Sequence, residues 1–244
     1  MSAPAELFDY LTTAAHWWGR NGIAHRIVDH VRLSAVSTIA AAGLAIPPAM
    51  VLGHVKRGGL AAASIVNIGR AIPSFAILAI LFPLSLEYGF GLGFWPTFGA
   101  LVLLAIPPMF TNTYAGIRDV DPSVVEASRG MGMRRRDVLL RVETPAALPL
   151  IITGVRVSAV QVVATATLGA LVGFGGLGAF IVAGVSQQDD GKLLTGALLV
   201  ALLAVLTELL FSTLERILTP WRRASVRRLA RVRDRTIAAP VSIS

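Results

Sequence analysis

The sequence contains no cysteine and few charged residues. Without cysteine the chain can form neither a disulfide nor a thiolate metal site. Cysteine content therefore does not indicate whether the protein lies in an oxidising or a reducing compartment. Only 15% of its 244 residues are charged, whereas a typical soluble domain has about 25%, and 55% are hydrophobic. The mean hydropathy is +0.69, so the composition favours a membrane protein over a soluble domain.

Charges are also scarce within the long apolar runs. A helix needs about 20 apolar residues to span a bilayer. The run 144–188 is too long for one span and leaves a half-length apolar segment after the glycine-rich stretch 173–178. We therefore expect an all-α polytopic membrane protein with about five core transmembrane helices. Their runs are 33–53, about 64–86, 94–117, the first part of 144–188, and 193–214.

Lys and Arg are distributed unevenly between the two sides that these spans define. One side collects 16 of them, from the loop after the first span, the segment 118–141 and the tail 216–235, whereas the other side carries 4. Because Lys and Arg accumulate in cytoplasmic loops, we expect the N-terminus outside and the C-terminus in the cytoplasm. Topology and anionic lipid thus explain the net charge of +8, and nucleic acid is not an expected partner.

The two ends of the chain differ from its middle. Residues 1–30 contain apolar residues at helical spacing and the pair Trp17-Trp18, which favours an N-terminal helix lying on the membrane surface. A loosely ordered tail is the alternative, and a signal peptide is not expected. Residues 31–218 form the transmembrane domain, and 219–244 form a basic cytoplasmic tail.

The stretch 173–178, GFGGLG, matches a dinucleotide-binding pattern but lacks its context. No strand–turn–helix unit is expected around it, and it lies within an apolar run. A flexible break at the outer membrane face is the better interpretation, since glycine permits turns closed to other residues. The sequence also contains no phosphate-binding loop of the G-x-x-x-x-G-K-[ST] type. If ATP drives transport, another polypeptide must bind it.

One segment, 119–145, interrupts the apolar sequence with nearly balanced charges, and we call it the charged segment. Counting Arg118 beside it, six arginines face five acids there. Ser123 and Glu126 fit a capping box at the start of a short helix, and Gly130 and Gly132 would end it. A second short helix is expected from 133 to before the proline at 145. Balanced charge mixed with apolar residues indicates a surface for docking another protein.

The charged segment resembles the signature of a known family. Permeases of bacterial ABC importers carry a cytoplasmic loop with Glu-Ala-Ala, three residues, Gly, nine residues and Ile-x-Leu-Pro. At the same offsets this chain has Glu126, Ala127, Ser128, Gly132, Val142 and Pro145. Ser128 and Val142 depart conservatively from the pattern. Thr144, in the leucine position, departs further and would weaken an apolar docking contact.

The likeness extends over about 33–218, through stretches such as NIGRAIPSFAILAILFPL and TATLGALVGFGGLGAFIVAG. These look like the permeases of osmoprotectant importers. The resemblance implies a type I ABC importer permease fold in the bacterial inner membrane. It also implies a translocation path for glycine betaine, choline, carnitine or proline betaine. A permease for another small solute, such as an amino acid of the methionine type, is the alternative.

The resemblance also implies partners. These are a separate cytoplasmic ATPase that receives the charged segment in a groove, an extracytoplasmic solute-binding protein, and a second permease, identical or related. The chain itself is then not an enzyme and carries no cofactor. Glu126 has two open roles, capping its own helix or contacting the ATPase. The residues expected to couple to the ATPase are Glu126, Ala127, Ser128, Gly130, Gly132, Val142 and Pro145.

Three ionisable residues lie within the predicted spans, where an unpaired charge is costly. Arg156 and Glu208 should lie at similar depths, and we expect them to form a structural ion pair. Arg70 stands near Pro73 and either lines the path or holds a kink. A fixed cation is an unusual lining for a path that carries a cation, which favours a structural or gating role unless the solute is zwitterionic.

The sequence lacks the residues that a secondary transporter or a membrane-embedded enzyme would need. A secondary transporter usually needs acidic or histidine residues within its spans for ion coupling, and Glu208 is the only acid there. No membrane-embedded catalytic site or metal site is expected. Aromatic residues make up only 7% and the tryptophans fall near span ends, so no cage for a quaternary ammonium is visible. The histidines expected outside the span cores are His16, His25, His30 and His54.

Overall fold

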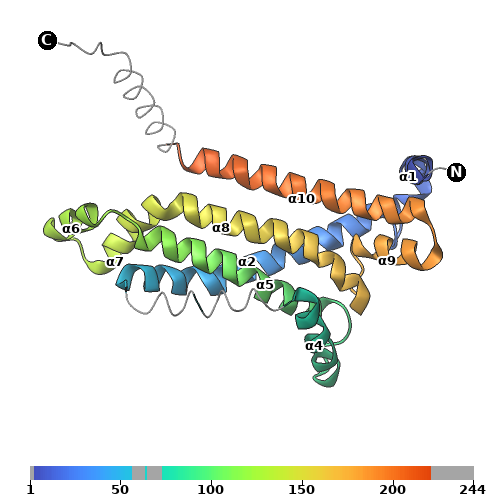
Figure 1. The fold of residues 1–244 in the computed structure, drawn as a ribbon, viewed down its shortest axis with the longest axis horizontal. Helices are drawn as coiled ribbons and strands as arrows, with labels where there is room; N and C mark the ends of the chain where they lie inside the picture. Colours follow the sequence, from blue (N-terminus) through green and yellow to red (C-terminus); the bar gives the residue numbers. More distant parts are fainter. Residues whose placement is uncertain (1–2, 57–63, 65–72, 221–244) are drawn as a thin grey trace, which may run out of the picture.

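The computed structural model describes residues 3–56, 64 and 73–220, and every regular element in these ranges is helical. Four long helices run along one another in Figure 1, and they are α2 (Ile23–Val55), α5 (Phe94–Arg118), α8 (Thr144–Thr165) and α10 (Asp190–Leu218). Within the described ranges, α2, α5, α10 and the continuous helical run that contains α8 are long and apolar enough to cross a membrane. The described part of the expected span 64–86 is mainly α4 (Ser74–Glu87), and Arg70 lies outside the described residues.

The two ends of the bundle carry different elements. At one end, α1 (Ala3–Thr12) and α9 (Gly178–Gln187) lie beside the start of α10 (Figure 1). The opposite end carries α6 (Pro122–Gly130) and α7 (Arg135–Val138), which belong to the charged segment. The bundle therefore separates the N-terminal helix from the charged segment by the length of its long helices.

Small residues let the central helices approach closely. Ala41, Ala45 and Ala49 recur every four residues on α2 and are buried in one cluster with Ala105 of α5. Close approach of backbones is what drives helix association in lipid, where apolar side chains gain nothing by leaving their surroundings. A polar contact adds to it, since the Ser158 hydroxyl of α8 donates to the Ala105 carbonyl at 2.8 Å.

The long run 144–188 folds into three helical pieces, as its length requires. α8 continues into the 3-10 helix η3 (Ala166–Val172), and α9 begins at Gly178, the last residue of the glycine-rich stretch. Helices precede and follow the GFGGLG stretch, so the strand needed for a dinucleotide site is absent from this described part of the chain.

His30 joins three parts of the chain near this glycine-rich break. Its side chain is fully buried. Nε2 lies 2.9 Å from the Val163 carbonyl oxygen of α8, and the Leu177 N–H donates to Nδ1 at 3.3 Å. A carbonyl only accepts, so these partners require a neutral imidazole with its proton on Nε2. His30 lies on α2, which begins at Ile23, so its side chain is buried inside the bundle, and its expected position outside the core of the span stays a prediction.

The N-terminal residues form a packed element, and the loosely ordered alternative is wrong for residues 3–22. α1 contacts α10, and the Trp17 indole N–H donates to the Leu11 carbonyl at 2.8 Å. Phe8 and Trp18 have exposed side chains. A position at the membrane surface stays a prediction, which these exposed aromatic residues suit. Most of the basic tail, from residue 221 on, lies outside the described residues.

We expect His30→Ala to reduce the stability of the purified permease by roughly 2–4 kcal/mol, because it leaves the Val163 carbonyl and the Leu177 N–H buried without this partner. His25→Ala is the matched control, since His25 lies on the same helix with a half-exposed side chain. Thermal unfolding in one detergent measures both variants. A His30→Ala midpoint equal to that of the wild type would contradict the three-way contact.

Candidate functional site

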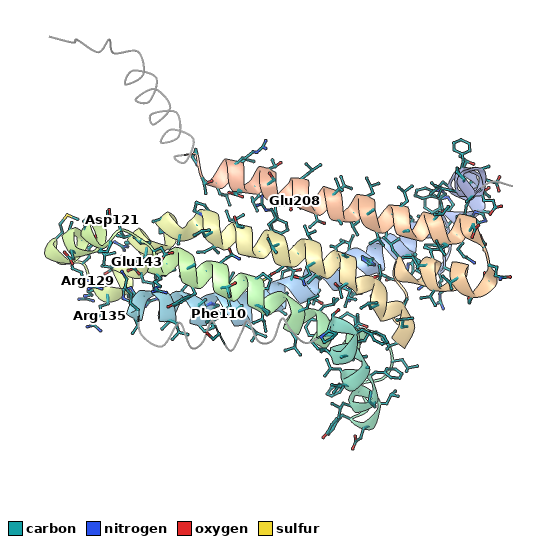
Figure 2. All side chains as sticks on the ribbon, in the orientation of Figure 1. Phe110, Asp121, Arg129, Arg135, Glu143 and Glu208 are labelled. Atoms are coloured by element: carbon teal, nitrogen blue, oxygen red, sulfur yellow. The ribbon has the colours of Figure 1, made fainter. Side chains whose placement is uncertain are left out.

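The charged segment is a compact unit at one end of the bundle. Figure 2 shows Asp121, Arg129, Arg135 and Glu143 at this end, well away from Glu208 along the bundle. A small apolar cluster holds α6 and α7 together, and it consists of Val120, Val125 and Val138 with Met133 packed against them. The segment therefore has its own core beneath its charged surface.

Asp121, not Ser123, caps α6. The Asp121 carboxylate accepts a hydrogen bond from the Ser123 backbone N–H at 2.8 Å, and Pro122 occupies the first helical turn. Hydrogen bonding by Ser123, through its side chain and its backbone, lowers the pKa of Asp121 below its usual range. The expected capping box is therefore wrong, because the residue before the proline fills the cap. Glu126 is exposed and is not used as a cap.

The two glycines near the end of α6 have different roles. Gly130 has a helical conformation, and a Cβ there would meet nothing within 4 Å. Gly132 has φ +85, a left-handed conformation that favours glycine. The Gly132 N–H donates to the Arg129 carbonyl and the Met133 N–H to the Ser128 carbonyl, the pair of bonds that defines a Schellman turn. Gly132 alone provides the turn that the sequence assigned to both.

The family-motif residues of α6 divide between two faces. Ala127 and Glu126 are exposed, as are their neighbours Val124 and Met131. Ser128 is only 4% exposed, and its hydroxyl donates to the Val124 carbonyl of its own helix at 2.7 Å. Ser128 therefore lies against the chain itself, and the surface open to another protein is formed by its neighbours.

The second short helix does not end before Pro145. α7 passes into a π turn, η2 (Leu139–Glu143), which continues directly into α8. Thr144 has a part in this geometry, since its hydroxyl donates to the Leu139 carbonyl at 2.7 Å. Pro145 lies at the start of α8, directly after the π turn. Val142 is half-buried and Pro145 exposed, and the charged segment is continuous with a long helix of the bundle.

A buried pair joins the π turn to α2. Glu143 is 1% exposed, and its Oε2 lies 2.5 Å from Nδ1 of His54, near the end of α2. A buried carboxylate without a partner is strongly destabilising, so this contact fixes where α2 and the π turn meet. Sequence reasoning placed both residues near loops and missed the pair, because 89 positions separate them.

The structure brings Arg156 and Glu208 together, and it adds a third charge. Arg156 Nη1 lies 3.5 Å from Glu208 Oε1 and 3.4 Å from Glu215 Oε2. The two glutamates are seven residues apart on α10, which is two helical turns, and so they face α8 together. Glu215 was missed because the expected span ended at 214, one residue short of it. The three charges attach α10 to α8.

No group of three or more His, Asp or Glu side chains able to hold a metal ion occurs among the described residues. The site therefore consists of a capped, glycine-turned surface at one end and ionic contacts between helices.

Comparison with known proteins assigns the chain to a class. Residues 38–224 match the family described as the binding-protein-dependent transport system inner membrane component. The chain belongs to this family of transport permeases. Two relatives in particular are similar over most of their length. The choline transport system permease protein OpuBB of Bacillus subtilis (strain 168) is 34% identical, over 81% of this chain and 89% of the relative. The carnitine transport permease protein OpuCB of Listeria monocytogenes is 35% identical, over 79% of this chain and 86% of the relative.

Solved structures share the fold. The MetNI methionine ABC transporter, in an inward-facing conformation, has a chain that matches with a TM-score of 0.69 and 24% identity, over 81% of this chain and 96% of that one. An amino acid ABC transporter with histidines matches with a TM-score of 0.67 and 18% identity, over 86% of this chain and 97% of that one. The architecture is therefore that of ABC importer permeases, as expected from the resemblance.

A double-variant cycle tests the Glu143–His54 pair. We expect His54→Ala to destabilise the purified permease by roughly 3–5 kcal/mol, because it leaves a carboxylate buried and unpaired. Adding Glu143→Gln should recover part of that loss, since a neutral amide is cheaper to bury. Thermal midpoints of the wild type, both single variants and the double variant measure the coupling. Strictly additive losses would show that the two side chains do not depend on each other.

Proposed function

We propose that the chain is the membrane-spanning permease subunit of an ABC importer for osmoprotectants such as glycine betaine, choline, carnitine or proline betaine. The observation that carries this is similarity to osmoprotectant permeases through both the bundle and the charged segment. Relatives named for choline, carnitine and glycine betaine transport favour this solute class over the methionine class, since the match to methionine transporters is below 25% identity.

The charged segment is the part that contacts the ATPase in this proposal. Ala127 is small and exposed, so a partner's surface can approach the α6 backbone there. Asp121 and Gly132 fix the two ends of the helix, which makes the surface rigid. Rigidity is needed because ATP can shift the equilibrium between two states of the permease only by the difference in its binding free energy to those states. A flexible contact would lose part of that difference. Glu126, freed from capping, is available for a polar contact with the ATPase.

The remaining partners follow from the family. A binding protein delivers solute at the α1–α9 end of the bundle, and a second permease, identical or related, completes the path. In the orientation set by the Lys and Arg count, the charged segment and the C-terminus are cytoplasmic and the N-terminus is outside. Anionic lipid then lies beside the basic tail. ATP is bound by the separate ATPase, and the permease itself carries no cofactor.

Uptake measurements test the solute and the contact together. The chain is expressed together with its ATPase and solute-binding protein, in a bacterial strain lacking its own osmoprotectant uptake. We expect labelled glycine betaine, choline or carnitine to be taken up and methionine not. Ala127→Trp should lower uptake about tenfold or more. A bulky side chain in a docking contact weakens binding to the ATPase, and about 1.4 kcal/mol of lost binding free energy is a factor of ten. The amount of permease in the membrane should not change.

Ala201→Trp is the control, because it adds the same bulk to an exposed position on α10 that is remote from both ends of the bundle. Uptake of methionine alone would contradict the solute class. Normal uptake in Ala127→Trp would instead contradict the role of α6 and leave the solute class standing.

A further inference from the structure

A small cavity lies beside the start of α5, far along the bundle from the charged segment. Its volume is about 210 Å³, and its lining residues are Asp29, Arg32, Leu33, Phe94 and Phe174. Asp29 and Arg32 are near the start of α2, whose other end meets Glu143. Phe94 is the first residue of α5, whose other end leads into the charged segment. The cavity is therefore at the end where solute arrives in the proposed function.

Aromatic rings form one wall of the cavity. The Phe94 and Phe174 rings meet at an angle of 51° with centroids 6.3 Å apart, and Phe98 stacks on Phe94 at 5.8 Å. Gly93 makes this approach possible, since a Cβ there would lie 2.8 Å from the Phe174 backbone. Two phenylalanines that are 80 positions apart in the sequence thus line one space. Aromatic faces attract quaternary ammonium groups.

Two opposite charges complete the lining. Asp29 is paired with His25 on its own helix at 3.4 Å, and its side chain is about one-third exposed. Arg32 is exposed, and among the described residues no carboxylate lies within ion-pair distance of it. Its guanidinium is therefore available to an anionic group, and a guanidinium can hold a carboxylate by two hydrogen bonds.

We propose that this cavity binds a compact zwitterion, with its quaternary ammonium against Phe94 and Phe174 beside Asp29 and its carboxylate on Arg32. The assignment rests on the proposed function, and it adds a solute site on the permease itself. The size agrees, because pockets for drug-sized ligands occupy about 300–1,000 Å³ and this one suits a smaller molecule. It also brings together two aromatic residues that nothing in the sequence placed side by side.

The site predicts a preference that one substitution should change. Arg32→Gln removes the group that would bind the carboxylate of glycine betaine. It also removes a positive charge that repels a cationic solute such as choline, which has no carboxylate. At saturating solute, we expect the maximal uptake rate of glycine betaine to fall about tenfold relative to that of choline, which has no carboxylate. Choline uptake should stay the same or rise, and this shows that the variant is folded and assembled. Arg32→Lys should restore part of the glycine betaine rate.

Two controls separate the site from general effects. Arg20→Gln removes an equal charge from an exposed position outside the cavity, and it should leave the ratio of the two rates unchanged. Phe174→Leu should lower uptake of both solutes about threefold to tenfold, because both carry the quaternary ammonium. Phe90→Leu changes an exposed ring that does not line the cavity, and it should have no effect.

The outcomes distinguish this site from the proposed function. A wild-type importer that takes up neither solute would overturn the proposed function and the site with it. If the wild type takes up both and Arg32→Gln changes both rates by the same factor, the site alone is overturned. A selective loss of glycine betaine uptake supports it.

Discussion

The absence of water from a bilayer's hydrocarbon core is the constraint on which this structure depends. A buried polar group without a partner in the protein is costly there. His30 uses both ring nitrogens to join α2, α8 and the glycine-rich turn. Arg156 faces two glutamates of α10. Each contact holds helices that apolar packing alone would leave free to slide, since lipid tails are as apolar as the helix surfaces.

The charged segment follows the same rule with a different result. Its polar backbone groups are satisfied locally, by the Asp121 cap and the turn at Gly132, so its outer surface needs no further partner from its own chain. The π turn connects the segment without interruption to α8, and the Glu143–His54 contact connects it to α2. In the proposed function, a force applied at α6 is therefore passed to two helices of the bundle at once.

Much of this arrangement could be predicted from the sequence, because bilayer thickness and helix geometry leave few alternatives. The four long helices and the meeting of Arg156 with Glu208 follow from the length of the apolar runs and from depth, and the end of α6 follows from its two glycines. The predicted cap of α6 was wrong because two neighbouring residues can each cap a helix. Asp121 fills the cap position in place of Ser123, since Pro122 occupies the first turn. Contacts between distant positions, such as Glu143 with His54 and Phe94 with Phe174, have no local pattern and were missed.

The absence of cysteine allows a direct test of the central claim, that α6 is the cytoplasmic contact with the ATPase. Met131 is 77% exposed, so Met131→Cys would be the only thiol in the chain. With a membrane-impermeant maleimide, the account predicts no labelling in intact spheroplasts and labelling in inverted vesicles stripped of the ATPase. It also predicts protection when the ATPase is added back. Labelling from the outside, or equal labelling with and without the ATPase, would contradict the account.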